Sequence, residues 1–216
     1  KCEAYAYGHQ CCDFSDGTLV CLTPGESISM KENNKEFPSK GWILAFHPDL
    51  ICGTPLGLNI HNYTFFSYCP EEALHLSLRE KQIILEFLER IRQELERCID
   101  RHSKKIISKY IELLLDYCTR FYERQFITRS EVNKKVFREF NHLLDNHFNV
   151  KVSLSTDVLS DEYCANLLHL SPAYFNDLLK YEIGKEFKEY IQFKRFEIAK
   201  GWLVNTDKTL GQIAQE

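Results

Sequence analysis

Two helix-start signals near the C-terminal end of the chain constrain its fold more than any other feature. Ser160 precedes Asp161-Glu162, and a Ser before such an acidic pair favours the first turn of a helix. Ser171-Pro172 is a second start signal, because Ser caps well and Pro at the first helical position loses no hydrogen bond. Gly184 then predicts the end of the second helix. Two short helices joined by a turn form a helix-turn-helix.

The second predicted helix has one apolar face and one polar face. The apolar stripe contains Phe175, Leu178, Leu179 and Ile183, and the opposite face carries Ala173, Asn176, Asp177 and Lys180. Asn176 can pair with adenine, Ala173 can touch a thymine methyl group, and Lys180 can meet a phosphate. Asp177 can accept from cytosine but repels the phosphate backbone. We therefore predict that this face enters a major groove of DNA.

A weak internal repeat follows the predicted motif. A connecting helix is expected over about residues 186–204, and Thr209 with Gln212 then forms a capping box. The spacing from Thr209 to Ala214 repeats the spacing from Ser160 to Ala165. We expect a second helix-turn-helix that this chain only begins, and a true N-terminus that lies upstream of Lys1.

Residues 77–152 change to a helical period. Three apolar stripes predict three helices, with breaks near residues 100–103 and 125–128. The second stripe is the candidate for a subunit interface, although internal helix packing would give the same pattern. It contains Ile107, Tyr110, Ile111, Leu114, Cys118, Phe121 and Tyr122.

Residues 1–76 are interpreted as a β domain. Four short segments lie between turn signals: Glu3–Tyr7, Thr18–Leu22, Ser27–Met30 and Trp42–Phe46. They predict part of a β-sandwich or barrel. The candidate pocket residues for a small-molecule effector are Trp42, Phe46, Tyr63 and Phe65, with Phe66 beside them. The alternative for each of these aromatic residues is a place in the domain core.

The nine cysteines favour reduced thiols and a cytoplasmic location, since their number is odd, their spacing is irregular and no export signal is present. Cys11-Cys12 is either redox-active or inert, and inert thiols are favoured because no cationic residue adjoins the pair. No apolar run approaches the ~20 residues that span a bilayer, so no membrane partner is expected. The net charge is −4, and residues 157–216 are acidic on balance, which is unusual for a segment that binds DNA.

The stretch from Leu170 to Phe175, with Gly184, Tyr190-Ile191 and the segment 205–208, resembles the AraC/XylS-type transcriptional regulators. Residues 41–69 resemble the effector segment of one branch of that family. The resemblance implies a bacterial, non-enzymatic regulator that binds promoter DNA, dimerises and responds to a small molecule, without a cofactor.

It also implies an α+β fold. A partial cupin-like domain would occupy residues 1–76, a helical dimerisation region residues 77–152, and a helix-turn-helix domain residues 153–216. The residues predicted to contact DNA are Ser171, Ala173, Tyr174, Asn176, Asp177 and Lys180.

Two other functions stay open. A cupin-type metal enzyme would need histidines and a carboxylate in one place, but His9, His47 and His61 are scattered and no H-x-H follows Pro24-Gly25-Glu26. His47 is therefore predicted to be a structural hydrogen-bonding residue, and no metal site is expected. A protein-interaction module without DNA binding is the second alternative, because pairs of helices often serve only for packing.

Overall fold

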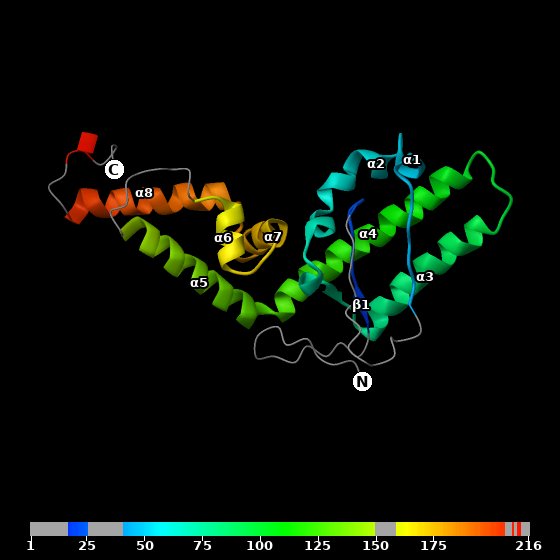
Figure 1. Ribbon diagram of the computed structural model, residues 1–216, viewed down its shortest axis with the longest axis horizontal. Coiled ribbons are helices and arrows are strands. Elements are labelled where there is room, and N and C mark those ends of the chain that lie inside the picture. The colour runs from blue at the N-terminus through cyan, green and yellow to red at the C-terminus, as the bar shows by residue number, and fades with distance from the viewer. Residues whose placement is uncertain (1–16, 26–40, 150–158, 206–208, 210, 213–216) are drawn as a thin grey trace. The chain divides into compact units, whose positions relative to one another are not determined.

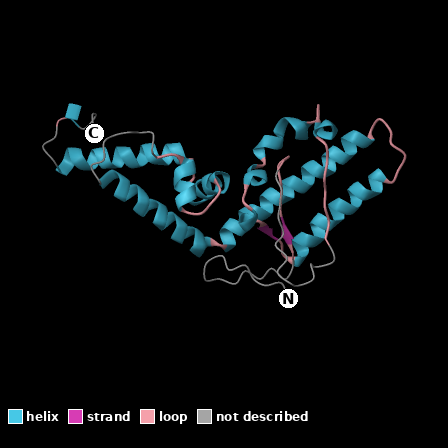
Figure 2. Ribbon diagram, viewed as in Figure 1, coloured by secondary structure: helices cyan, strands magenta, loops and turns pink. Residues whose placement is uncertain are grey.

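The computed structural model describes residues 17–25, 41–149, 159–205, 209 and 211–212 of the chain (Figure 1). The chain divides into two compact units, residues 1–127 and residues 128–216. Helices make up most of the described residues in both units (Figure 2).

The strands of the first unit are short. Strand β1 (Thr18–Leu19) pairs antiparallel with β2 (Leu74–His75), and Thr18 lies opposite His75. Along the chain, helices α1 (Pro48–Ile51) and α2 (Pro55–Asn59) lie between these two strands. Three 3₁₀ turns follow, at Ile60–Asn62, Thr64–Ser67 and Pro70–Glu72.

The predicted cupin-like β domain, and with it the α+β fold class, is wrong: the described part of the first unit contains one two-stranded ladder and no barrel or sandwich. Proline explains part of the error. Pro48, Pro55 and Pro70 each start a short helix or 3₁₀ turn, where the missing N–H of proline costs nothing.

The remaining predicted strands have three different outcomes. Trp42–Phe46 is not a strand, and within the described residues no strand pairs with it. The strand predicted at Thr18–Leu22 is present only as β1. Glu3–Tyr7, Ser27–Met30 and the Cys11-Cys12 pair lie outside the described residues.

Two long helices carry the core of the first unit. Helix α3 (Leu78–Leu95) begins at a capping box between Ser77 and Glu80, and α4 (Ser103–Thr128) follows it. The rings of Phe87 and Tyr117 lie 5.4 Å apart between these helices. Both helices, and the break near residues 100–103, were predicted from the apolar stripes.

Polar side chains of α4 join it to the segment that precedes α3. Arg124 donates to the carbonyl oxygen of His75 over 2.6 Å and forms an ion pair with Glu80 over 2.8 Å. The buried Gln125 accepts from the backbone N–H of His75 and donates to the carbonyl oxygen of Ala73. These bonds satisfy backbone groups that would otherwise be buried without partners.

The second apolar stripe of the sequence packs inside the first unit. Ile111 and Cys118 are at most 1% exposed, and the rest of the stripe is buried too except for the half-buried Tyr110. The interpretation as internal helix packing is therefore correct, and apart from the half-buried Tyr110 this stripe is not available as a subunit interface.

The second unit contains four helices within its described residues: α5 (Ser130–Asn149), α6 (Asp161–Leu167), α7 (Pro172–Ile183) and α8 (Phe187–Asn205). Phe140 of α5 is fully buried and meets Phe175 of α7 edge to face at 5.0 Å. Phe187 and Tyr190 of α8 complete the same aromatic cluster. The core of this unit therefore joins α5 to α7 and to α8.

Candidate nucleic-acid interface

Helix α6 begins where the sequence predicts. The Ser160 side chain accepts a hydrogen bond from the Tyr163 N–H over 3.0 Å and caps the helix. The helix ends within two turns, because Leu170 N–H bonds back to the Ala165 carbonyl over 2.9 Å and closes the turn. His169 lies inside this turn at a φ of +57°, a left-handed conformation that prevents the helix from continuing.

Helix α7 is also bounded as predicted. The Ser171 side chain accepts from the Tyr174 N–H over 3.2 Å, and Pro172 occupies the first helical position. Gly184 ends the helix at a φ of +67°, and its N–H bonds to the Lys180 carbonyl over 2.9 Å. The two helices and their turn therefore form the helix-turn-helix arrangement that the sequence predicts.

Small and apolar side chains hold α6 against α7. Ala165 is completely buried, as expected for a small residue at a close helix approach, and Cys164 beside it is 1% exposed. Phe175 and Leu179 of α7 are buried too, and Phe175 contacts Phe140 of α5. Burial of these side chains fixes the direction in which the opposite face of α7 points.

The structure separates the six predicted DNA-contact residues into two groups. Ser171 and Tyr174 are 4% and 5% exposed, and the Ser171 hydroxyl caps α7. Both therefore contribute to the motif's own packing. Ala173, Asn176 and Asp177 are half-buried, and Lys180 is exposed. Contact between these four residues and DNA stays a prediction.

One contact of this face was missed by the sequence analysis. Asn176 donates from Nδ2 to Oδ2 of Asp161 over 2.9 Å and so links α7 to the first residue of α6. Asp161 was interpreted only as an acidic residue that suits a helix N-terminus. No local pattern pairs two residues so far apart in the chain, so only the packing of the two helices reveals the bond.

Lysine side chains lie close to aromatic rings of α8. The ammonium group of Lys200 lies 4.5 Å from the centre of the Phe196 ring, and that of Lys185 lies 5.9 Å from the centre of the Phe193 ring. Both rings are exposed, at 60% and 45%. The second unit therefore carries local positive charge on α8 despite the acidic balance of its sequence.

The predicted repeat after α8 is partly visible. Thr209 and Gln212 form the expected capping box: Thr209 N–H donates to the Gln212 side chain over 2.9 Å, and Gln212 N–H donates to the Thr209 hydroxyl over 3.4 Å. Ala214 lies outside the described residues.

The four aromatic residues predicted to line an effector pocket do not line one cavity. Phe65 is buried and stacks on Tyr122, and Phe46 packs at the edge of the same core. Trp42 is 53% exposed and borders a shallow groove along α3. Tyr63 donates to Asp116 over 2.8 Å, and burial together with this carboxylate raises the pKa of the phenol.

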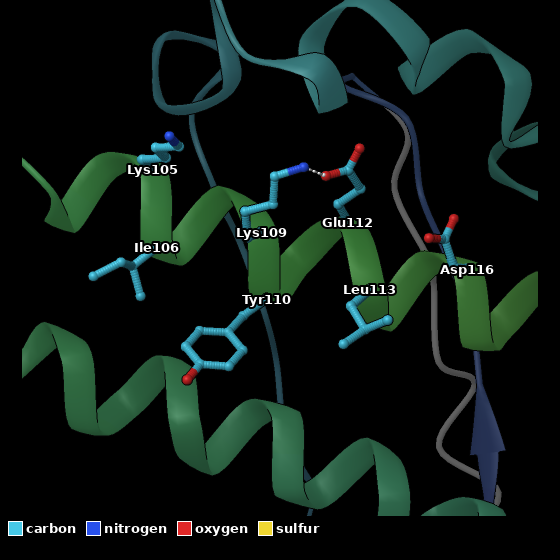
Figure 3. A pocket seen from close by; sticks show the side chains of 7 residues that line it. All are labelled: Lys105, Ile106, Lys109, Tyr110, Glu112, Leu113 and Asp116. Atoms are coloured by element: carbon cyan, nitrogen blue, oxygen red, sulfur yellow. Dashed lines mark hydrogen bonds and ion pairs between the residues drawn. The ribbon is translucent and has the colours of Figure 1, made fainter.

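A larger groove of about 630 Å³ runs along α4. Its lining residues all come from this helix: Lys105, Ile106, Lys109, Tyr110, Glu112, Leu113 and Asp116. Figure 3 shows the charged side chains on one edge of the groove and the apolar ones on the other. Two lysines precede two acids along the charged edge, and Lys109 pairs with Glu112 over 2.6 Å.

The part of the chain that the structure describes holds no cluster of side chains suited to bind a metal ion. No group of three or more His, Cys, Asp or Glu side chains there could hold a metal ion. His47 caps α1 by accepting from the Asp49 N–H over 3.2 Å, which confirms its predicted structural role. His9 and Glu26 lie outside the described residues.

Among the described helices, none combines the length and the apolar character that crossing a membrane requires.

One known protein is similar to part of this chain. It is an uncharacterised HTH-type transcriptional regulator of Bacillus subtilis (strain 168), YtdP, which is 29% identical over 86 residues. The match covers 40% of this chain and 11% of the relative, so the chain spans only a small part of that protein. No protein-family profile and no solved structure matches the chain.

Proposed function

We propose that this protein is a sequence-specific DNA-binding transcription regulator of the AraC/XylS type, and that α7 is its recognition helix. The observation that carries the proposal is the geometry of α6 and α7: two capped helices whose shared core turns Ala173, Asn176 and Lys180 to the accessible side of α7. The similarity to an HTH-type transcriptional regulator supports the same function.

The chemistry of this face fits a major groove. Ala173 and Asn176 lie in the first half of α7, and the N-terminal residues of a recognition helix are those that reach base edges. The amide of Asn176 can pair with adenine through N6 and N7. Lys180 is exposed one turn further along, where it can neutralise a phosphate.

The charge of the chain predicts modest affinity. Phosphate neutralisation supplies much of the binding free energy of DNA-binding proteins, and this chain has a net charge of −4. Lysines on α8 and just before it, including Lys200 and Lys185, provide basic groups within the same unit as α7. Binding is therefore expected to weaken steeply as salt is added.

The test is fluorescence anisotropy of the 216-residue chain with two probes: labelled duplex from upstream of its own gene, and random duplex of equal length. We expect tighter binding to the upstream duplex, and we expect Asn176→Ala to remove this difference. Glu182→Ala, at a half-buried position of the last turn of α7, is the control that should keep it. Equal binding of wild type to both probes would instead favour the protein-interaction module.

A homodimer is part of the proposal, and the groove along α4 is the surface that suits it. Lys105 and Lys109 precede Glu112 and Asp116 at mirror-related spacings about a point between Tyr110 and Ile111. A two-fold axis through this point would place α4 antiparallel to α4 of a second copy. Each copy's Lys109 would then face the other's Glu112, and Lys105 would face Asp116.

The apolar edge of the groove lies close to the same axis, with the point midway between Ile106 and Leu113 one residue before the point midway between Lys109 and Glu112. Ile106 and Leu113 are 37% and 44% exposed, and they lie on either side of the half-buried Tyr110. In the antiparallel arrangement Ile106 of one copy approaches Leu113 of the other, which would remove both from water. A second copy therefore satisfies the charged and the apolar edge together. Effector binding and a cytoplasmic location accompany the family resemblance and remain predictions.

A further inference from the structure

The bond between Asn176 and Asp161 places an acid next to the amide that is proposed to read a base. Nδ2 of Asn176 donates to Oδ2 of Asp161 over 2.9 Å, and both side chains are half-buried. A carboxylate accepts hydrogen bonds and cannot donate them when ionised. It therefore fixes which end of the amide faces α6, because only the NH₂ group can form this bond.

We infer that Asp161 is a positioning residue that orients the Asn176 amide for adenine. This inference rests on the proposed function and adds to it a residue outside the recognition helix. The Asn176 nitrogen carries two hydrogens, and Asp161 takes one of them. The second N–H and the amide oxygen stay available, and these are the two groups that pair with N7 and N6 of adenine.

The position of Asp161 is itself fixed by α6. Asp161 is the first residue of the helix, directly after the Ser160 cap, and one turn before the buried Cys164. Burial, and secondarily the negative charge of Asp161, raises the pKa of the Cys164 thiol to about 11. From this position the carboxylate accepts the hydrogen bond from Asn176 of α7.

Orientation matters because a free amide can turn over. Rotation about the last side-chain bond exchanges the oxygen and the NH₂ group of Asn, and the exchanged form offers a donor where adenine N6 also offers one. An amide held by Asp161 avoids this mismatch before DNA arrives. The expected effect is on base preference at one position of the site, separate from overall affinity.

A matched pair of charge removals tests the inference. Asp161→Asn removes the fixed acceptor, since the new amide can either donate or accept, while Glu162→Gln removes the same charge from the adjacent residue of α6. Each variant of the 216-residue chain is mixed with a pool of duplexes randomised in their central bases, and the bound and input pools are sequenced. Wild type and Asn176→Ala provide the two reference profiles, and Asp161→Asn/Asn176→Ala completes a double-mutant cycle.

We expect wild type to prefer adenine by about tenfold at the position that Asn176→Ala loses. Asp161→Asn should reduce that preference to below about threefold, and Glu162→Gln should leave it unchanged. In the Asn176→Ala background, Asp161→Asn should not alter the profile further. Both charge removals should raise the affinity for random duplex to a similar extent, because each removes one repulsive charge.

The outcomes that overturn the inference differ from those that overturn the proposed function. Unchanged adenine preference in Asp161→Asn would show that the bond only joins the helices. A stronger preference would show that the carboxylate competes with the base. If wild type itself selects no sequence, or if Asn176→Ala keeps the wild-type profile, the proposed reading face is wrong.

Discussion

The hydroxyl of Tyr190 donates a hydrogen bond to Oδ1 of Asn141 over 2.6 Å and joins α8 to α5. Phe137 and Phe140 also belong to α5, and the centres of their rings lie 5.8 and 5.9 Å from the centre of the Tyr190 ring. Helix α5 therefore belongs to the same packed unit as the helix-turn-helix. Its core should determine whether the proposed recognition helix is held in place.

Removing the central ring of that core should destabilise the second unit. Phe140 is fully buried, and we expect Phe140→Ala to lower the free energy of unfolding by about 3–5 kcal/mol. Urea titration can follow this unit through Trp202 of α8 once Trp42 is replaced by Phe. Phe196→Ala, at a ring 60% exposed, is the control and should change stability by less than about 0.5 kcal/mol. Equal effects of the two variants would contradict the packing described for α5.

Two glycines of this unit should respond to alanine with opposite signs. A Cβ would meet no atom within 4 Å at Gly184 or at Gly201, so the backbone alone decides the effect. Gly184 has a φ of +67°, where Ala costs about 1–2 kcal/mol. Gly201 lies inside α8, where Ala favours the helix by about 1 kcal/mol. The midpoints of thermal unfolding should therefore fall for Gly184→Ala and rise for Gly201→Ala.

Salt dependence should separate the predicted phosphate contact from the predicted base contact. Lys180→Ala is expected to reduce the slope of log K against log salt by about 1 and to leave sequence preference intact. Asn176→Ala should keep the slope and lose the preference. Lys104→Ala, at an exposed position of α4, controls for the loss of a positive charge. A Lys180→Ala slope equal to that of wild type would remove Lys180 from the interface.

Charge reversal tests the proposed dimer. Lys109→Glu should place acids opposite Glu112 of the second copy and weaken self-association, measured by sedimentation equilibrium over a range of concentrations. The double variant Lys109→Glu/Glu112→Lys exchanges the two signs in both copies, so it should restore the dimer. Monomeric wild type at high concentration would refute the dimer. Self-association of the double variant as weak as that of Lys109→Glu would refute this pairing of charges.

Thiol reactivity should follow burial. Burial raises the pKa of Cys164 to about 11, and at pH 8 little of it is the reactive thiolate. Cys52, Cys69 and Cys98 are exposed, so iodoacetamide at pH 8 should modify them first. Cys118 and Cys164 are buried and should react only after unfolding in urea. Peptide mass spectrometry resolves each site, and rapid modification of Cys164 in the native protein would contradict the packing of α6 on α7.

Local signals were sufficient to predict most of the helices. Ser160, Ser171-Pro172 and Gly184 bound α6 and α7 as expected, because caps and a left-handed stop depend on residues within one turn. The apolar stripes of α3, α4 and α5 were likewise readable, since helical periodicity is a local property. The polar face of α7 was readable for the same reason.

Contacts between distant residues determined the rest. The segment Trp42–Phe46 has a strand-like composition, but no segment in the described part of the chain pairs with it, and strands form only when a second segment supplies the hydrogen bonds. The stripe that was the preferred interface on α4 faces its own core, because a stripe does not specify what covers it. Sequence thus determined where the helices of the motif begin and end. Only the tertiary structure decided that Ser171 and Tyr174 are buried and that Asp161 meets Asn176, since these depend on how separate helices pack.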